Sequence, residues 1–394
     1  MKYITPKGFL YSTIEAAVKK PGRKDVALIV SAVEAEMAGT FTTNTVKAAP
    51  VRICMKKIVA GTGQAIVVNS GNANACTGRQ GTKDAQEMIS SVAAAAGIDK
   101  SLVYIASTGV IGTPLPMERI RPVLGDLTKN IGSATIDDVA ATIMTTDTFP
   151  KIVQKRLKIG GVTGTISAVC KGAGMIAPNM ATMLCFIMTD FAVAKNTLSC
   201  VLKNAVNKSF NRITIDGDMS TNDTVLMMAN GLAGNRAVTM KSADLPKFQA
   251  AVDEITYALA ELVVKDGEGA TKLIEVVVKG CRNEKDAEKA AFAVANSSLV
   301  KTAIYGNDAN WGRIICAVGY SGIPLKEDKA DIWFNNVRVV KGGLANNRDK
   351  EATAVLKEKK IRITVDLHAG KASAKVLTCD LTEEYIRINA EYRT

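Results

Sequence analysis

A threonine at the end of a glycine-rich loop is the residue in this sequence whose type and position best suit nucleophilic chemistry. The loop runs from Lys171 to Thr182, reads KGAGMIAPNMAT, and has a strand-like segment on each side. A threonine hydroxyl attacks a carbonyl poorly unless a base removes its proton. A cut between Ala181 and Thr182 would create that base, because a free α-amino group has a pKa of about 7.7–8.0. On composition alone, however, an ordinary β-branched strand residue is the commoner interpretation of Thr182.

The chain itself can make this cut. The Thr182 hydroxyl would attack the Ala181 carbonyl, and water would hydrolyse the resulting ester. Two glycines in the loop allow the tight backbone that presents this carbonyl. Cleavage would divide the protein into an alpha chain, residues 1–181, and a beta chain, residues 182–394, that begins with the nucleophile.

The scarcity of histidine favours a base of this unusual kind. His368 is the only histidine, so a histidine-rich metal site cannot be built, and its sequence surroundings predict a surface hairpin. The eight cysteines are scattered and none forms C-x-x-C, the spacing typical of zinc and iron–sulfur sites. We therefore predict no metal and no cofactor, and reduced core cysteines in a cytoplasmic protein.

Charge and hydropathy narrow the classes of partner. The formal charge is +12, of which residues 1–181 carry +9 (21 basic and 12 acidic residues) and residues 182–394 carry +3 (29 and 26). Such a balance suits acidic ligands, but aromatic residues make up only 5% and no RNA-binding motif is present, so nucleic acid is not expected. The uncharged run 172–189 contains Pro178 and Asn179, which predicts buried strands around a polar loop rather than a membrane span.

The loop at residues 171–184 closely resembles the self-cleaving signature of the ornithine acetyltransferase family, the bifunctional glutamate N-acetyltransferases of arginine biosynthesis. The resemblance covers essentially the whole chain, with one small departure at Met219, where the family pattern has threonine. Further matching motifs follow in family order: Asn69–Ala75, Ser107–Gly112, Thr145–Thr148, Asp216–Asp223, Asp266–Thr271, Asn307–Arg313 and Ile388–Thr394.

The resemblance assigns roles to residues that composition alone predicts to lie in ordinary turns and loops. It implies that Thr108 and Gly109, after a predicted strand, form the oxyanion hole. It places Thr145, at the end of a predicted helix, and Lys171 at the substrate, where a lysine suits a substrate carboxylate. The alternatives are a strand-to-loop turn for Thr108 and Gly109, a capping or turn cluster for Thr145, and a solvated loop lysine for Lys171.

The resemblance also places the second half of the chain at the substrate. Glu268 lies between two glycines and can approach a substrate ammonium group; its alternative is a polar turn. Asn389 and Thr394 belong to a tail that closes over the substrate in the family, although terminal disorder is the usual expectation. The loop 216–223 lacks the spacing of a calcium site, so we expect a structural turn or support for the site.

The implied activity is acetyl transfer from N-acetylornithine to glutamate through an acetyl-Thr182 ester, with ping-pong kinetics. Use of acetyl-CoA as a second donor is left open by the residues. The family also implies an assembly of two alpha and two beta chains, with no nucleic acid and no membrane. Two alternatives are a self-processing aminopeptidase with the same nucleophile and a non-catalytic basic binding protein.

Alternating strand-like and helix-like segments must position these residues, and they predict an α/β (α+β) fold with layered sheets. The resemblance implies an α/β/β/α-type sandwich around the nucleophile and a smaller C-terminal α/β domain. A domain boundary is expected near residues 190–210. From residue 330 the pattern predicts mostly hairpins and a short helix at 349–359. Predicted strands are 26–32, 64–69, 102–106, 162–170, 183–188 and 272–279, and predicted helices are 82–96, 117–127, 136–144, 195–210, 245–265 and 284–295.

Overall fold

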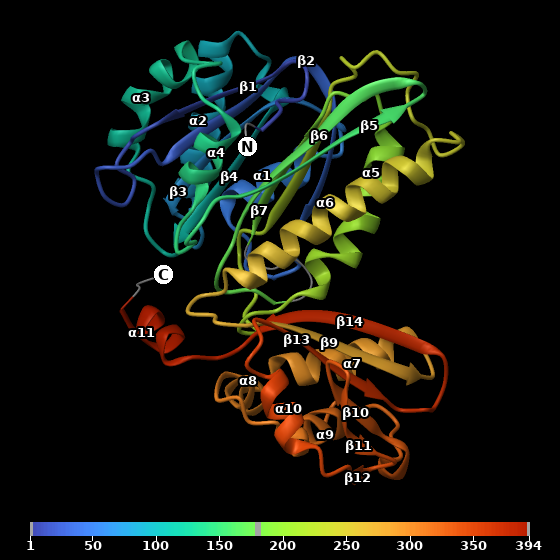
Figure 1. The fold of residues 1–394 in the computed structure, drawn as a ribbon. Coiled ribbons are helices and arrows are strands. Elements are labelled where there is room, and N and C mark those ends of the chain that lie inside the picture. Colours follow the sequence, from blue (N-terminus) through green and yellow to red (C-terminus); the bar gives the residue numbers. More distant parts are fainter. Residues whose placement is uncertain (1–2, 178–182, 392–394) are drawn as a thin grey trace.

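Two β-sheets organise the chain in a computed structural model, which describes residues 3–177 and 183–391 (Figure 1). The larger sheet has the strand order β4-β3-β2-β8-β7-β6-β5, with β1 paired to β2. Its strands are β1 (Phe9–Ile14), β2 (Val26–Phe41), β3 (Thr62–Asn72), β4 (Val103–Val110), β5 (Lys151–Ile159), β6 (Val162–Lys171), β7 (Leu184–Thr189) and β8 (Thr224–Ala229).

The long strand β2 divides this sheet into two layers. Its pairing with β3 shifts register between Val30 and Ala35, and its later residues pair with β8 instead. An irregularity of this kind bends a strand and increases its twist. One continuous apolar core joins residues of β1–β4 with one face of β6, β7 and β8. The two halves of the sheet therefore pack on each other.

Helices cover the outer side of each layer (Figure 1). Helices α2 and α3 lie against β1–β4, and α5 and α6 lie against the strands of the other layer. All six residues of β7 are buried and alternate between the two cores: Phe186 and Met188 face the first, and Cys185 and Ile187 the second. This arrangement confirms the predicted α/β fold. The helices are α1 (Ala49–Lys57), α2 (Gly78–Ala96), α3 (Met117–Lys129), α4 (Ile136–Ile143), α5 (Lys195–Lys208) and α6 (Leu245–Lys265).

Local signals explain several helix boundaries. Helix α2 ends at Gly97, which adopts a left-handed conformation with φ of 66° and so provides a glycine stop. Helix α4 starts with a capping box in which the Thr135 and Asp138 side chains each accept a backbone N–H of the other residue. A proline in the first turn opens α6.

The C-terminal unit is a six-stranded sheet in the order β12-β11-β10-β13-β9-β14, with helices packed on it. The predicted hairpin tail is correct for β10 and β11 but wrong for β13, which pairs in parallel with the distant β9. The elements are β9 (Leu273–Cys281), α7 (Glu284–Asn296), α8 (Ser298–Tyr305), α9 (Trp311–Gly319), β10 (Asp331–Phe334), β11 (Val337–Lys341), β12 (Leu344–Ala345), α10 (Asp349–Val355), β13 (Lys360–Asp366), β14 (Ala372–Cys379) and α11 (Glu383–Glu391).

Two further expectations need correction. His368 does lie at the surface, but in a turn between β13 and β14, which flank β9 instead of forming a hairpin. Five of the eight cysteines are buried, as expected for core residues, whereas Cys76 and Cys316 are exposed. No helix among the described residues has both the length and the apolar character needed to cross a membrane.

The change from one sheet to the other falls between α6 and β9, after Lys265, and not near residues 190–210. In the sequence, the predicted cleavage position falls between β6 and β7, two neighbouring strands of the larger sheet. These strands pair with each other from Ile166–Thr189 to Lys171–Leu184. A cut there would leave the two pieces joined by a shared sheet.

Candidate active site

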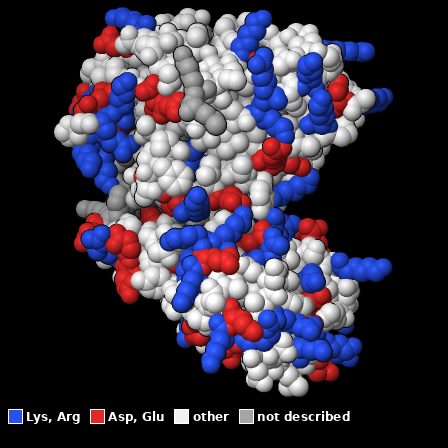
Figure 2. All heavy atoms as spheres, viewed as in Figure 1, with Lys and Arg blue, Asp and Glu red and all other residues white. Residues whose placement is uncertain are grey.

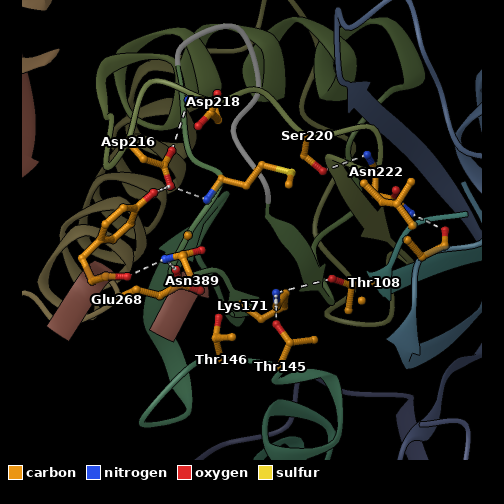
Figure 3. A pocket seen from close by; sticks show the side chains of 16 residues that line it. Thr108, Thr145, Thr146, Lys171, Asp216, Asp218, Ser220, Asn222, Glu268 and Asn389 are labelled. Atoms are coloured by element: carbon orange, nitrogen blue, oxygen red, sulfur yellow. Dashed lines mark hydrogen bonds between the residues drawn. The ribbon is translucent and has the colours of Figure 1, made fainter. Parts of the chain in front are cut away.

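A pocket opens where the two layers of the larger sheet meet the C-terminal helix α11. It gathers the ends of β4 and β6, the loop after α4, the loop 216–222 and the loop before β9. Figure 3 shows side chains from these separate segments pointing toward one another. The lining residues are Ala73, Thr108, Gly109, Ile111, Thr145, Thr146, Lys171, Gly174, Met175, Asp216, Asp218, Ser220, Asn222, Glu268, Tyr385 and Asn389.

Lys171 is the buried cation of this pocket. It is the last residue of β6 and its side chain is 3% exposed. Its ammonium group donates to the Thr145 hydroxyl at 2.7 Å and to the Thr108 hydroxyl at 3.4 Å, and lies 3.7 Å from Asp147 (Figure 3). The structure thus brings three predicted site residues from three segments together. The predicted alternative of a solvated loop lysine is wrong.

Gly109 occupies a position that no other residue could take without rearrangement. Its φ is 132°, and a Cβ there would lie 2.3 Å from the carbonyl carbon of Gly71 and 2.5 Å from the nitrogen of Asn72. The backbone of β4 therefore approaches β3 very closely at the pocket. This contact gives Thr108 and Gly109 a defined position, and both lie within β4 rather than in the strand-to-loop turn of the predicted alternative.

A buried ion network, which the sequence does not predict, lies beneath the pocket. The Lys151 ammonium group, fully buried, lies 2.7 Å from Asp147 and 2.5 Å from Asp266. Asp147 also accepts the backbone N–H groups of Gly172, at 2.6 Å, and Thr145, at 3.0 Å. With Lys171, the network holds two positive and two negative groups. Buried charges are tolerated when they are paired in this way.

The pKa shifts follow from this arrangement. Burial by itself would raise the pKa of Asp147, but the ammonium groups of Lys171 and Lys151 outweigh burial and lower this pKa well below its usual range. Burial would likewise lower the pKa of Lys151, but Asp147 and Asp266 raise it. Asp147 and Lys151 are therefore both ionised at neutral pH.

Glu268 and Asn389 meet on the opposite side of the pocket. The Asn389 amide donates to Glu268 Oε2 at 2.8 Å (Figure 3). The Glu268 backbone N–H donates to Ala173 O at 2.8 Å, which ties the Glu268 loop to the chain just after Lys171. A Cβ on Gly174 would lie 2.4 Å from Glu268 Oε2, so the glycine makes room for this carboxylate.

The loop 216–223 supports the site by hydrogen bonds, in line with its predicted role. The Asp216 carboxylate accepts the N–H groups of Met175, at 2.6 Å, and Ile176, at 2.8 Å, and the Tyr385 hydroxyl donates to it at 3.3 Å. Burial raises the pKa of Asp216 against the opposing effect of these N–H groups. The Asn222 amide donates to the carbonyls of Ala73 and Ser107, at 2.6 and 2.8 Å, and so links this loop to the other layer.

Met183, the residue after Thr182, is held by hydrogen bonds at both its N–H and its carbonyl. The Met183 N–H donates to the buried carboxylate of Asp223 at 3.0 Å, and its carbonyl accepts the Thr224 N–H at 3.0 Å. Burial raises the pKa of Asp223 well above its usual range. The predicted site residues Ala181, Thr182 and Thr394 lie outside the described residues.

Six predicted site residues therefore line one pocket, although they come from five separate motifs: Thr108, Gly109, Thr145, Lys171, Glu268 and Asn389. Sequence reasoning missed Asp147, Lys151 and Asp266. Asp147 and Asp266 lie inside two of the matching motifs, so the sequence shows acidic residues at these places. Nothing in the sequence distinguishes Lys151 among the 50 basic residues. Among the described residues, no group of three or more His, Cys, Asp or Glu is arranged to hold a metal ion.

Comparison with known proteins gives a family for this arrangement. The model of the ArgJ family matches residues 10–394. A relative from Geobacter sulfurreducens, called arginine biosynthesis bifunctional protein ArgJ, is 55% identical, over 98% of this chain and 99% of the relative.

Two solved structures are similar to this chain over about half of its length. The crystal structure of an arginine biosynthesis bifunctional protein argJ from Bacillus halodurans is 46% identical, covers 52% of this chain and 98% of that chain, and has a TM-score of 0.51. An ornithine acetyltransferase from Mycobacterium tuberculosis, solved with ornithine, is 33% identical over 44% of this chain and 92% of that chain, with a TM-score of 0.39. The match of the family model and the identity to a full-length relative carry the conclusion that this chain belongs to the ArgJ family.

Proposed function

We propose that this protein transfers the acetyl group of N-acetylornithine to glutamate, in arginine biosynthesis, through an acetyl-Thr182 intermediate. Full-length similarity to relatives named as bifunctional proteins of arginine biosynthesis supports acetyl transfer over the aminopeptidase alternative. The observation that carries the site assignment is the meeting of Thr108, Gly109, Lys171 and Glu268 around one pocket.

The first half-reaction needs a nucleophile, a base and an oxyanion hole. The Thr182 α-amino group accepts the proton of the Thr182 hydroxyl, and the hydroxyl attacks the acetyl carbonyl. The Thr108 hydroxyl and the Gly109 N–H stabilise the oxyanion that develops there. Two features support these roles: Gly109 is held in close contact with β3, and Met183 is anchored at both its N–H and its carbonyl.

The pocket has charges of opposite sign for the two ends of the substrate. Lys171 binds a carboxylate of the substrate, and the neighbouring Thr145 hydroxyl shares this contact. Glu268, held by Asn389, receives an ammonium group of ornithine. In the second half-reaction the α-amine of glutamate attacks the acetyl ester and yields N-acetylglutamate. The burial of Lys171 supports this division, because an ammonium group with little access to water attracts a carboxylate more strongly.

Several finer statements belong to the same proposal. Acetyl-CoA serves as a second acetyl donor, a use supported by the word bifunctional in the names of the relatives. The protein cleaves itself before Thr182, and two alpha and two beta chains assemble in the cytoplasm. The Bacillus halodurans chain is about half as long as this one, which is the length expected of one cleavage product.

A non-catalytic basic binding protein is disfavoured by the family and by the face of the molecule that Figure 2 shows. Figure 2 shows Lys and Arg side chains over both parts of the molecule, with Asp and Glu side chains among them. A protein that binds nucleic acid would gather its positive charge in a patch or stripe along the contact surface.

The intact mass under denaturing conditions tests the nucleophile. Cleavage before Thr182 divides 41.7 kDa in the proportion 181 to 213 residues, into pieces of about 19 and 22 kDa. The wild-type protein should give both pieces, and Thr182→Ala should give only the full-length mass. An undivided wild-type chain would remove the proposed base, and with it this mechanism.

A transfer assay tests the substrate. With N-acetylornithine and glutamate, N-acetylglutamate and ornithine should appear in equal amounts, with parallel lines in double-reciprocal plots as expected for ping-pong kinetics. Release of free acetate without N-acetylglutamate would favour the aminopeptidase alternative. Replacing N-acetylornithine by acetyl-CoA tests the second donor separately.

A further inference from the structure

We propose that Lys151 is a positioning residue that holds the two substrate-binding loops at a fixed separation. This inference deepens the proposed function, because the loops in question carry Lys171 and Glu268. Lys151 itself touches neither the pocket surface nor any group assigned to the reaction. Its effect passes through Asp147 and Asp266.

The contacts on one side lead to Lys171. Asp147 Oδ1 accepts both the Lys151 ammonium at 2.7 Å and the Gly172 N–H at 2.6 Å. Asp147 Oδ2 accepts the Thr145 N–H at 3.0 Å and lies 3.7 Å from the Lys171 ammonium. Asp147 therefore fixes the backbone beside two pocket residues as well as the charge of Lys171.

The contacts on the other side lead to Glu268. Lys151 lies 2.5 Å from Asp266, which stands two residues before Glu268. Asp266 also accepts the backbone N–H of Thr148 at 3.0 Å and is hydrogen-bonded to the Thr148 hydroxyl. The Glu268 N–H in turn donates to Ala173 O at 2.8 Å. The Lys151 ammonium group thus connects Asp147, in the segment before β5, with Asp266, in the loop after α6. The end of β6 joins this connection through the Gly172 N–H on Asp147.

The charges explain why the centre of this bridge is a lysine. All four side chains of the network are buried, with exposures of 0% for Lys151 and Asp147, 2% for Asp266 and 3% for Lys171. Without Lys151, two carboxylates would share the single ammonium group of Lys171. Lys171 would be drawn toward Asp147 and away from the substrate, and the pKa of Asp147 would rise because one of the two ammonium groups that lower it would be gone.

A pair of variants separates the charge of Lys151 from its bridging role. Lys151→Met removes both. Lys151→Met with Asp266→Asn restores a balance of one positive and one negative group, Lys171 and Asp147, but leaves the bridge broken. Lys301→Met is the matched control, because Lys301 is also a buried lysine, and among the described residues its ammonium group hydrogen-bonds only to Thr378 and Cys379 of the C-terminal unit.

The kinetic measurement is the pH profile of kcat/KM for N-acetylornithine with glutamate. We expect Lys151→Met to lower kcat/KM roughly 100-fold, the usual cost of a misplacement of about 1 Å. We also expect its acid limb to move to higher pH, because Asp147 loses one of its two ammonium partners. The double variant also lacks the Lys151 ammonium, so its acid limb should move back toward the wild-type position only in part, through loss of the Asp266 charge, and its KM should not recover. Lys301→Met should leave the shape of the profile unchanged even if it lowers thermal stability.

Hydrogen exchange of the Glu268 amide gives a readout that does not depend on catalysis. This N–H should exchange faster in Lys151→Met and in the double variant than in the wild-type protein or Lys301→Met. Unchanged exchange at Glu268 in both Lys151 variants would overturn the inference even if activity fell. If the wild-type protein transferred no acetyl group, the proposed function would fail, and the exchange experiment would still decide the positioning role.

Discussion

The two sides of the pocket are built in opposite ways. Lys171 ends β6, an interior strand of the larger sheet, is buried, and contacts an ion network that is also buried. The opposite side depends on α11, which has no buried residue among those described and is held by single polar contacts such as Asn389–Glu268 and Tyr385–Asp216. Segments with few buried apolar contacts open at low free-energy cost.

This contrast suggests a division of labour. A reaction that develops charge at a carbonyl needs donors that are already in place, and the sheet side supplies them. A ping-pong enzyme must also admit and release two substrates in turn, which a rigid, closed pocket would slow. The exposed helix side can open for this exchange without disturbing Lys171.

The sharpest test of the contrast is removal of the buried cation. Lys171→Met should lower kcat/KM on the order of 10²–10³-fold, because it removes the partner of the substrate carboxylate and leaves Thr108 and Thr145 without their common donor. Steady-state kinetics with N-acetylornithine measures this loss. Lys155→Met, on the partly exposed lysine of β5, is the control and should change kcat/KM little. Equal losses in both variants would contradict a special role for Lys171.

The rigidity of the sheet side can be tested at Gly109. Gly109→Ala should destabilise the protein by roughly 1–3 kcal/mol through its φ of 132° alone, and the clash with the backbone of Gly71 should add to this. Urea unfolding measures the change. The matched control is Gly125→Ala, in helix α3, where a Cβ meets nothing within 4 Å and alanine should be neutral or stabilising. Similar stabilities of the two variants would show that β4 can yield at the pocket.

The ion network should also be visible in the pH dependence of stability. The pKa of Asp147 is lowered in the folded protein, so this carboxylate stabilises the fold fully above the unfolded value of about 3.9 and loses that effect as the pH falls toward its folded pKa. The gap in unfolding free energy between wild type and Asp147→Asn should therefore narrow below about pH 4. Asp126→Asn, at an exposed ion pair, should show no such narrowing. A constant gap for Asp147→Asn would mean that its charge does not stabilise the fold.

The smallest effect is expected on the helix side. Asn389→Ala removes one hydrogen bond to Glu268 and should raise the KM for N-acetylornithine about fivefold with little change in kcat. Arg387→Ala is the control on the same helix, since Arg387 pairs only with the exposed Glu384 among the described residues. A loss in kcat as large as that of Lys171→Met would erase the distinction between the two sides.

The sequence predicts most of the regular elements because their apolar residues recur with clear periods. Helix α6 begins and ends at the predicted residues, and β6 and β7 flank the loop as expected. The strand β5 was missed because four of its nine residues are Lys or Arg, which disguises its apolar alternation. The partner of β13 could not be predicted either, since its parallel pairing with β9 joins segments almost 90 residues apart, Lys360 and Leu273 among them.

The pocket residues follow the same division. Composition alone predicts turns at Thr108–Gly109, Thr145 and Glu268. Only the family motifs identify these residues as candidates for the active site. Their meeting around Lys171 depends on the bend of β2, which brings one layer of the sheet over the other.

What the sequence by itself determined is the set of motifs, the α/β alternation and the presence of a single histidine. Each depends on residue types and short spacings that the printed chain contains. What only the tertiary structure decided is which charges are buried together. Lys151 looks like any other lysine until the fold places it between Asp147 and Asp266, because the energy of a charge depends on its distance from other charges and from water, and folding sets both.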